Sequence, residues 1–163
     1  MNKTLKVELS NKEEILIAKE LYRIRAKWLK DKGIEQWRRS EQIHSVEYLM
    51  TQQELNQFYV CKFNGVIIGA FSLQKEDIFW KDKENSLYLH AFVSSVNYSG
   101  YGRFMIDEMK KICKHKNKKY LRLDCRADNE KLNEFYKNNG FYLVEQRVYS
   151  HGVVANLREL KIV

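Results

Sequence analysis

The stretch that decides the fold is residues 123–141, LDCRADNEKLNEFYKNNGF. It begins as the end of an apolar strand and turns at Asp128-Asn129. One amphipathic helix then covers residues 129–138, and Gly140 follows where glycine commonly closes a helix. The stretch therefore predicts a strand, a tight turn and a helix.

Residues 87–103, LYLHAFVSSVNYSGYGR, form a second informative stretch. An apolar strand over residues 86–93 leads into a turn with Gly100 and Gly102, and a helix begins directly after it. Glycines let the backbone come close to a ligand, and the N–H groups and dipole at a helix start attract anions. The plainer alternative is a loop that needs two glycines for its geometry alone.

The other predicted elements extend this pattern over the chain. Asn64-Gly65 lies between two apolar runs and is a strong hairpin signal. We expect further strands over residues 4–9, 58–63, 66–73, 119–125, 141–149 and 154–162, with helices after Ser10-Asn11 and over residues 45–53. The first helix is expected to bury one apolar stripe, formed by Ile17, Leu21, Ile24 and Trp28 and widened by Ala18 and Tyr22.

The order of these elements defines the fold class. The hairpin makes the early strands antiparallel, whereas strand, helix, strand, helix in the second half favours parallel pairing. The predicted fold is α/β, with a central mixed antiparallel and parallel sheet flanked by helices. Because 163 residues with 44% hydrophobic residues can bury one substantial core, we expect a single domain over residues 1–163.

Composition indicates the cellular location and the state of the cysteines. No apolar run reaches the roughly 20 residues of a membrane span, and the N-terminus lacks a signal-peptide stretch, so a soluble cytoplasmic protein is expected. The three cysteines, Cys61, Cys113 and Cys125, are widely spaced and read as reduced core thiols. No disulfide framework and no metal site are expected.

The net charge of +8 could suit a polyanion, but the 29 Lys and Arg residues are dispersed. The strands also lack the exposed aromatic platform that nucleic-acid binding domains use. Nucleic acid is therefore not the expected partner, while a small phosphorylated ligand fits the charge. The sequence leaves a homodimer open.

Taken together, the two stretches resemble the GNAT superfamily of N-acetyltransferases. There an Asn is followed seven residues later by the Tyr of a Tyr-x-x-x-Gly-Phe ending, which Asn129 and residues 136–141 match. The family's Gln/Arg-x-x-Gly-x-Gly/Ala signature corresponds to residues 97–102, with two departures. Asn97 replaces the longer Gln or Arg, and Tyr98 stands where glycine is frequent.

The resemblance implies acetyl-CoA as cosubstrate. Main-chain groups of the central strand would pair with the pantetheine arm, the backbone of the glycine turn would hold the pyrophosphate, and Asn129 would cap the last helix and reach the arm. The implied cofactor-binding residues are His90, Ala91, Phe92, Asn97, Tyr98, Ser99, Gly100, Tyr101, Gly102, Arg103 and Asn129.

The resemblance also implies catalytic roles. Tyr136 matches the family tyrosine that protonates the departing CoA thiolate, whereas periodicity alone would make it a core aromatic beside Phe135. Asp124 stands where some members place a general base. The alternatives are an ordinary strand-end carboxylate paired with Arg122 or Arg126, or a helix-capping partner. His90 and water are the other candidate bases.

The implied function is transfer of acetyl from acetyl-CoA to a primary amine of a small molecule or peptide. The alternative is a non-catalytic acyl-CoA-binding sensor. The presence of Tyr136 favours the enzyme over the sensor. In this superfamily the acceptor wall would comprise residues 33–39 and 149–151. Trp37 and Trp80 could line a pocket or serve as packing anchors.

Overall fold

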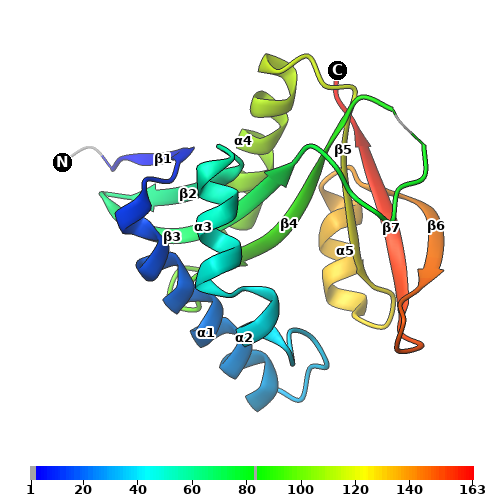
Figure 1. The fold of residues 1–163 in the computed structure, drawn as a ribbon, viewed down its shortest axis with the longest axis horizontal. Helices are drawn as coiled ribbons and strands as arrows, with labels where there is room; N and C mark the ends of the chain where they lie inside the picture. Colours follow the sequence, from blue (N-terminus) through cyan, green and yellow to red (C-terminus); the bar gives the residue numbers. More distant parts are fainter. Residues whose placement is uncertain (1–2, 83) are drawn as a thin grey trace. The chain divides into compact units, whose positions relative to one another are not determined.

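The computed structural model describes residues 3–82 and 84–163. Its elements, in chain order, are β1 (Leu5–Leu9), the 3-10 helix η1 (Lys12–Glu14), α1 (Ile15–Asp31), α2 (Ser40–Ile43), α3 (Val46–Glu54), β2 (Phe58–Phe63), β3 (Val66–Gln74), β4 (Ser86–Ser94), α4 (Gly102–His115), β5 (Tyr120–Arg126), α5 (Glu130–Asn138), β6 (Tyr142–Val148) and β7 (Val154–Lys161) (Figure 1). Each predicted strand and each predicted helix is confirmed, whereas η1 and α2 are too short to show a periodic pattern in the sequence.

The strands form a seven-stranded mixed sheet in the order β1-β2-β3-β4-β5-β7-β6. Pairing is antiparallel for β1 with β2 and for β2 with β3. β4 and β5 pair in parallel, with Leu87 opposite Leu121. β7 pairs antiparallel with both β5 and β6. The predicted fold class is therefore confirmed.

The chain divides into two compact units. One comprises the residues up to Leu73 together with His90–Met105, and the other comprises Gln74–Leu89 together with Ile106–Val163. The expectation of a single domain over residues 1–163 stays a prediction.

In the first unit, the 3-10 helix η1, which leads directly into α1, begins at a capping box. Asn11 Oδ1 accepts from the Glu14 N–H at 3.0 Å, and Glu14 Oε1 accepts from the Asn11 N–H at 3.0 Å. The hairpin turn at Asn64-Gly65 has positive φ at both residues, 50° and 82°, as a tight hairpin between twisted strands requires. The predicted cap and hairpin are thus confirmed.

The buried stripe of α1 differs from the predicted one. The fully buried residues of this unit's core are Ile15, Ala18, Tyr22, Leu49, Phe58, Val60, Ala70 and Val93, with Ile67 at its edge. Ile17 is 55% exposed and Trp28 is 37% exposed. Both faces of α1 carry apolar residues, so periodicity did not determine the rotation of the helix about its axis.

In the second unit, Trp80, Tyr88, Ala155 and Leu157 form a buried cluster with Phe79 and Tyr149 packed against it. Beside it the buried Arg122 is ion-paired with Asp82 and Glu159, each at 2.7 Å. The Arg122 guanidinium also stacks over the Trp80 ring at 4.3 Å. A charge this deeply buried is tolerated because it is paired and hydrogen-bonded.

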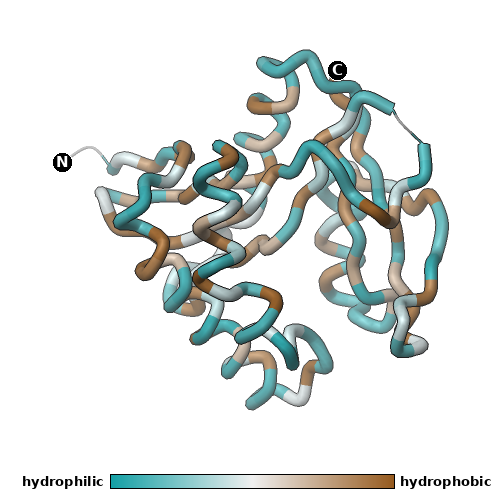
Figure 2. Tube along the Cα trace, viewed as in Figure 1, coloured by the Kyte–Doolittle hydropathy of each residue, from teal (hydrophilic) through white to brown (hydrophobic). Residues whose placement is uncertain are grey.

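Two further sequence expectations concern the thiols and the membrane. All three cysteines are free and buried, as predicted. Hydrophobic and hydrophilic residues alternate along α1 instead of forming one apolar block (Figure 2). Within residues 3–82 and 84–163, no helix is both long and apolar enough to span a membrane.

Candidate functional site

The predicted site residues fall into two groups, one in each unit. His90, Ala91, Phe92 and the loop over residues 97–103 belong to the first unit. Asp124, Asn129 and Tyr136 belong to the second.

The loop that follows β4 is fixed by its own backbone. The Ser95 N–H donates to the Ile68 carbonyl at 2.7 Å, which ties the loop to β3. The Asn97 N–H donates to Ser95 Oγ at 3.2 Å, and the Tyr98 N–H donates to the Ser95 carbonyl at 3.2 Å. Two of the predicted phosphate donors are thus already engaged inside the turn.

The next donors lie at the start of α4. The Tyr101 carbonyl accepts from the Met105 N–H at 3.1 Å, so Tyr101 immediately precedes the helix and Gly102 is its first residue. The N–H groups of Gly102, Arg103 and Phe104 lie in the first turn, where an α-helix leaves its donors unsatisfied. Within the described residues, no protein group accepts from these three. With the helix dipole and the exposed Arg103 guanidinium, they can bind an anion such as a pyrophosphate.

Phe104 is a candidate site residue that the sequence motifs did not indicate. It is already helical, and the recognised signature stops at Gly102. Its N–H group would have been included if the predicted phosphate donors had been extended through the whole first turn of the helix.

The glycines of the loop have different tasks. Gly100 has φ +88°, a conformation that L side chains rarely adopt. Gly102 is the first residue of α4 and is not among the residues with positive φ. The backbone freedom of glycine is therefore needed at Gly100, whereas the backbone conformation of Gly102 does not itself require glycine.

Gly69 is a third glycine that shapes the loop, and the sequence analysis gave it no role. A Cβ at this position would lie 2.6 Å from Met105 Sδ and 3.1 Å from the Val93 carbonyl oxygen. β3 therefore has a glycine where the first turn of α4 packs against it.

Two tyrosines anchor the loop through their rings. The Phe63 ring of β2 lies 6.1 Å from that of Tyr98 and 5.7 Å from that of Tyr101. The substitution of tyrosine for the glycine that is frequent at position 98 thus has a structural use. Its side chain packs on Phe63 of β2.

In the second unit, Tyr136 of α5 is a packed aromatic residue with a polar end. Its side chain is only 6% exposed, and its ring lies 5.5 Å from those of Phe135 and Phe141. Burial raises the pKa of Tyr136 well above its usual value, and the nearby Cys125 and Asp124 raise it further. The hydroxyl therefore stays protonated at neutral pH and can act as a proton donor.

Asp124 lies on β5, half-buried. The Tyr149 hydroxyl donates to Asp124 Oδ2, and a carboxylate oxygen of Asp77 lies within 4.8 Å of the Asp124 carboxylate. Burial raises the pKa of Tyr149 above its usual value. The charge of Asp124 and the hydrogen bond to this carboxylate raise it further. From the sequence, Tyr149 was expected only in the wall of the acceptor site. Asp77 was not expected at all, because it lies in an irregular segment without a motif.

Both neighbouring arginines form ion pairs with carboxylates. Arg122 pairs with Asp82 and Glu159, and Arg126 pairs with Asp128 at 2.7 Å. None of the sequence interpretations of Asp124 included its hydrogen bond from the Tyr149 hydroxyl.

Asn129 caps α5 as predicted, because its Oδ1 accepts from the Leu132 N–H at 3.1 Å. One turn later the buried Asn133 fixes the helix to the sheet. Its Oδ1 accepts from Asn156 at 2.8 Å and from Arg158 at 2.9 Å. These bonds fix α5, and with it Tyr136, relative to β7.

Both tryptophans that the sequence singled out are packing residues. Trp37 lies against the rings of Tyr22 and His44, with centroid distances of 5.8 and 4.6 Å. Burial lowers the pKa of His44 to about 4, with the charge of Lys19 as a second cause, so its ring is neutral. Trp80 is buried in the core cluster of the second unit.

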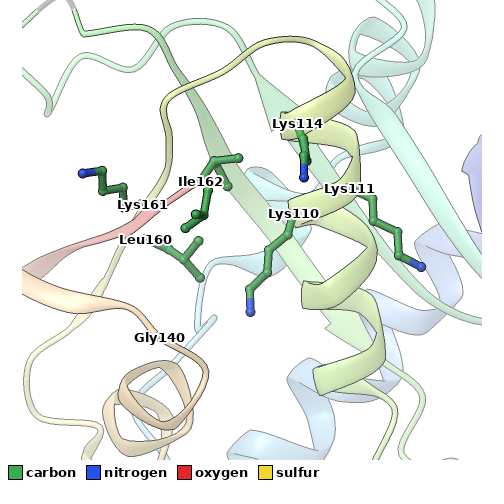
Figure 3. A pocket seen from close by; sticks show the side chains of 8 residues that line it. Lys110, Lys111, Lys114, Gly140, Leu160, Lys161 and Ile162 are labelled. Atoms are coloured by element: carbon green, nitrogen blue, oxygen red, sulfur yellow. The ribbon is translucent and has the colours of Figure 1, made fainter.

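A basic hollow of about 370 Å³ lies elsewhere in the second unit. Figure 3 shows lysine side chains extending from α4 on one side of it and the end of β7 on the other. Its lining residues are Lys110, Lys111, Lys114, Gly140, Leu160, Lys161, Ile162 and Val163. None of the predicted site residues lines it.

Comparison with known proteins decides the family. The model of the acetyltransferase (GNAT) family matches residues 18–141, which is most of the chain. The chain belongs to the GNAT acetyltransferase family. Sequence comparison finds the uncharacterized N-acetyltransferase YesJ of Bacillus subtilis (strain 168) as a relative. It is 27% identical over 128 residues, which cover 71% of this chain and 69% of YesJ.

Solved structures of GNAT proteins share the fold. A GNAT acetyltransferase from Listeria monocytogenes 4b F2365 superposes with a TM-score of 0.81 at 25% identity, covering 98% of this chain and 99% of that one. The PaiA N-acetyltransferase of Thermoplasma acidophilum, solved in complex with coenzyme A, gives a TM-score of 0.73 at 21% identity, covering 97% of this chain and 99% of that one. The second likeness shows the fold alone.

Proposed function

We propose that this chain is an N-acetyltransferase that transfers acetyl from acetyl-CoA to a primary amine of a small molecule or peptide. The observation that carries the proposal is the start of α4, where Gly102, Arg103 and Phe104 present N–H groups that no described protein group accepts from. Membership of the GNAT family supports acetyl-CoA as the anionic ligand, as does the coenzyme A bound to the Thermoplasma relative.

In this proposal the loop over residues 97–103 holds the pyrophosphate through its backbone. Because the N–H groups of Asn97 and Tyr98 are engaged with Ser95, the donors are those from Ser99 onward, together with Phe104. Main-chain groups of His90, Ala91 and Phe92 pair with the pantetheine arm, and Asn129 is proposed to reach it as well. Backbone recognition explains how the loop functions with Asn97 in place of Gln or Arg.

The proposed reaction needs three proton transfers. The acceptor ammonium loses one proton to the base, and the amine nitrogen forms a bond to the thioester carbonyl carbon. The C–S bond then breaks, the sulfur takes the phenolic proton of Tyr136, and the second proton of the nitrogen returns to the Tyr136 oxygen. The products are the N-acetylated amine, CoA with a free thiol, and one proton that leaves from the base.

We propose Asp124 as that base, because Tyr149 orients its half-buried carboxylate. His90 and water are the other candidates for this step. A cytoplasmic location is part of the proposal, since three buried free thiols suit a reducing compartment. A single domain is also part of it.

The acceptor is found by a thiol-release screen of polyamines, aminoglycosides, amino acids and peptides with free N-termini. We expect at least one amine to release CoA thiol in proportion to the amide formed, measured by thiol titration and mass spectrometry. A control without amine separates transfer from hydrolysis of the thioester. If acetyl-CoA binds but no amine in any class is acetylated, the sensor function replaces the enzymatic one.

A further inference from the structure

The conformation of β4 at Ala91 is unusual. Ala91 has φ 52°, in the left-handed region, where a Cβ is crowded by the backbone. Such a residue persists only where the surrounding structure imposes its conformation. The strain lies in the middle of the three residues whose backbone we propose for the pantetheine arm.

Tyr22 of α1 supplies a contact that imposes this conformation. Its hydroxyl donates to the Ala91 carbonyl at 2.6 Å, across 69 residues of sequence. The Tyr22 side chain is completely buried, and its ring is stacked on His44 with 4.6 Å between centroids. His44 is itself held by Ser40, whose Oγ lies 2.7 Å from His44 Nδ1. The hydroxyl therefore has little freedom to move away from Ala91.

Arg25, about one helical turn further along α1, supplies a second contact. Its Nη2 donates to the Ser94 carbonyl at 2.8 Å and its Nε donates to the same oxygen at 3.2 Å. The guanidinium lies over the Trp28 ring at 4.8 Å, which limits its mobility. One face of α1 thus holds two carbonyls of β4, three residues apart.

We propose that Tyr22 and Arg25 are positioning residues that hold the β4 backbone from Ala91 to Ser94 in the conformation that accepts acetyl-CoA. By bonding the carbonyls of Ala91 and Ser94 they fix the rotation of the intervening peptide groups. The N–H and carbonyl groups meant for the ligand then point in defined directions before the ligand arrives. This inference rests on the proposed binding of acetyl-CoA along β4.

The first test is Tyr22→Phe, which keeps the buried ring and removes the hydroxyl. We expect acetyl-CoA to bind about tenfold more weakly, the effect of losing one hydrogen bond. The KM for acetyl-CoA should rise by a similar factor, while kcat at saturating acetyl-CoA stays within about twofold, because Tyr22 does not act in the chemical step. Calorimetry and steady-state kinetics measure the two effects.

Ala91→Gly provides the decisive comparison. Glycine adopts positive φ without a steric penalty, so in this background the strand no longer depends on the tyrosine hydroxyl. We expect Tyr22→Phe to weaken binding by no more than about twofold when Ala91→Gly is present. A hydroxyl whose effect on binding is independent of the Ala91 conformation would instead give the same tenfold loss in both backgrounds. That result would overturn the proposal.

Arg25→Met is the independent second variant, and it covers the case in which Tyr22→Phe does not fold. Methionine keeps much of the aliphatic stem of this half-buried residue and removes the bonds to Ser94. We expect acetyl-CoA affinity to fall several-fold with kcat unchanged. Tyr142→Phe, which removes the hydroxyl that bonds Glu159 at 2.5 Å in the second unit, is the control and should leave affinity unchanged.

The outcomes separate this inference from the proposed function. If the wild-type protein does not bind acetyl-CoA, the proposed function fails. If the wild type binds and both the folded Tyr22 and Arg25 variants bind equally well, the function stands and the positioning role is wrong.

Discussion

Replacing Tyr136 by phenylalanine is expected to lower the turnover of the accepted amine by about 10²- to 10⁴-fold, the usual effect of losing a general acid. The ring packs on Phe135 and Phe141 and is almost wholly buried, so phenylalanine preserves the packing. Only the hydroxyl is lost. Because burial keeps the pKa of Tyr136 high, this hydroxyl carries its proton at neutral pH.

Ground-state binding should change little in the same variant. We expect the affinity for acetyl-CoA, measured by calorimetry, to stay within a few fold, since the hydroxyl acts only when the thiolate departs. Tyr142→Phe is the matched control, because it also removes a hydrogen-bonded phenol from the second unit and should retain wild-type turnover. Single-turnover kinetics exclude a product-release step that would mask the loss. If the Tyr136→Phe variant had the single-turnover rate of the wild type, Tyr136 would be a packing residue and not the general acid.

Gly102→Val is expected to abolish detectable binding of acetyl-CoA while leaving the protein folded. Gly102 is helical and lacks the positive φ of Gly100, so valine can adopt its backbone conformation. Its branched side chain would, however, fill the space that a phosphate needs against the first-turn N–H groups. The substitution therefore tests close approach of the phosphate, with the melting temperature of the ligand-free variant as the control for folding.

A graded series strengthens that test. Gly102→Ala adds one methyl group and should weaken binding by an intermediate amount, measured by calorimetry together with the melting temperature of each ligand-free variant. Gly100→Val, by contrast, should lower the ligand-free melting temperature, because Gly100 has φ +88°. A folded Gly102→Val protein with wild-type affinity would show that the loop is not the phosphate site.

The sequence predicted the elements and the family well because both depend on local patterns. The Asn64-Gly65 turn, the Asn129 cap and the glycine turn before α4 each involve a few consecutive residues. Apolar periodicity located the strands and helices but misjudged the buried stripe of α1. There Ala18 and Tyr22 face the core while Ile17 does not.

What the sequence did not predict depends on contacts between distant segments. Tyr22 reaches Ala91 across 69 residues, and Tyr149 reaches Asp124 across 25. β7 lies between β5 and β6, a strand order that local patterns do not encode. The positive φ of Ala91 gave no signal either, because alanine is not a residue that marks such a conformation.

The central claim, that the folded chain binds acetyl-CoA through the start of α4, is tested most directly by a thermal shift. A ligand that binds only the folded state stabilises it by about 2.7 kcal/mol at a hundredfold excess over its Kd. For a protein of this length we predict a rise in Tm of about 5 to 10 °C with acetyl-CoA for the wild type, and none for Gly102→Val. An unchanged Tm of the wild type at millimolar acetyl-CoA would contradict the account.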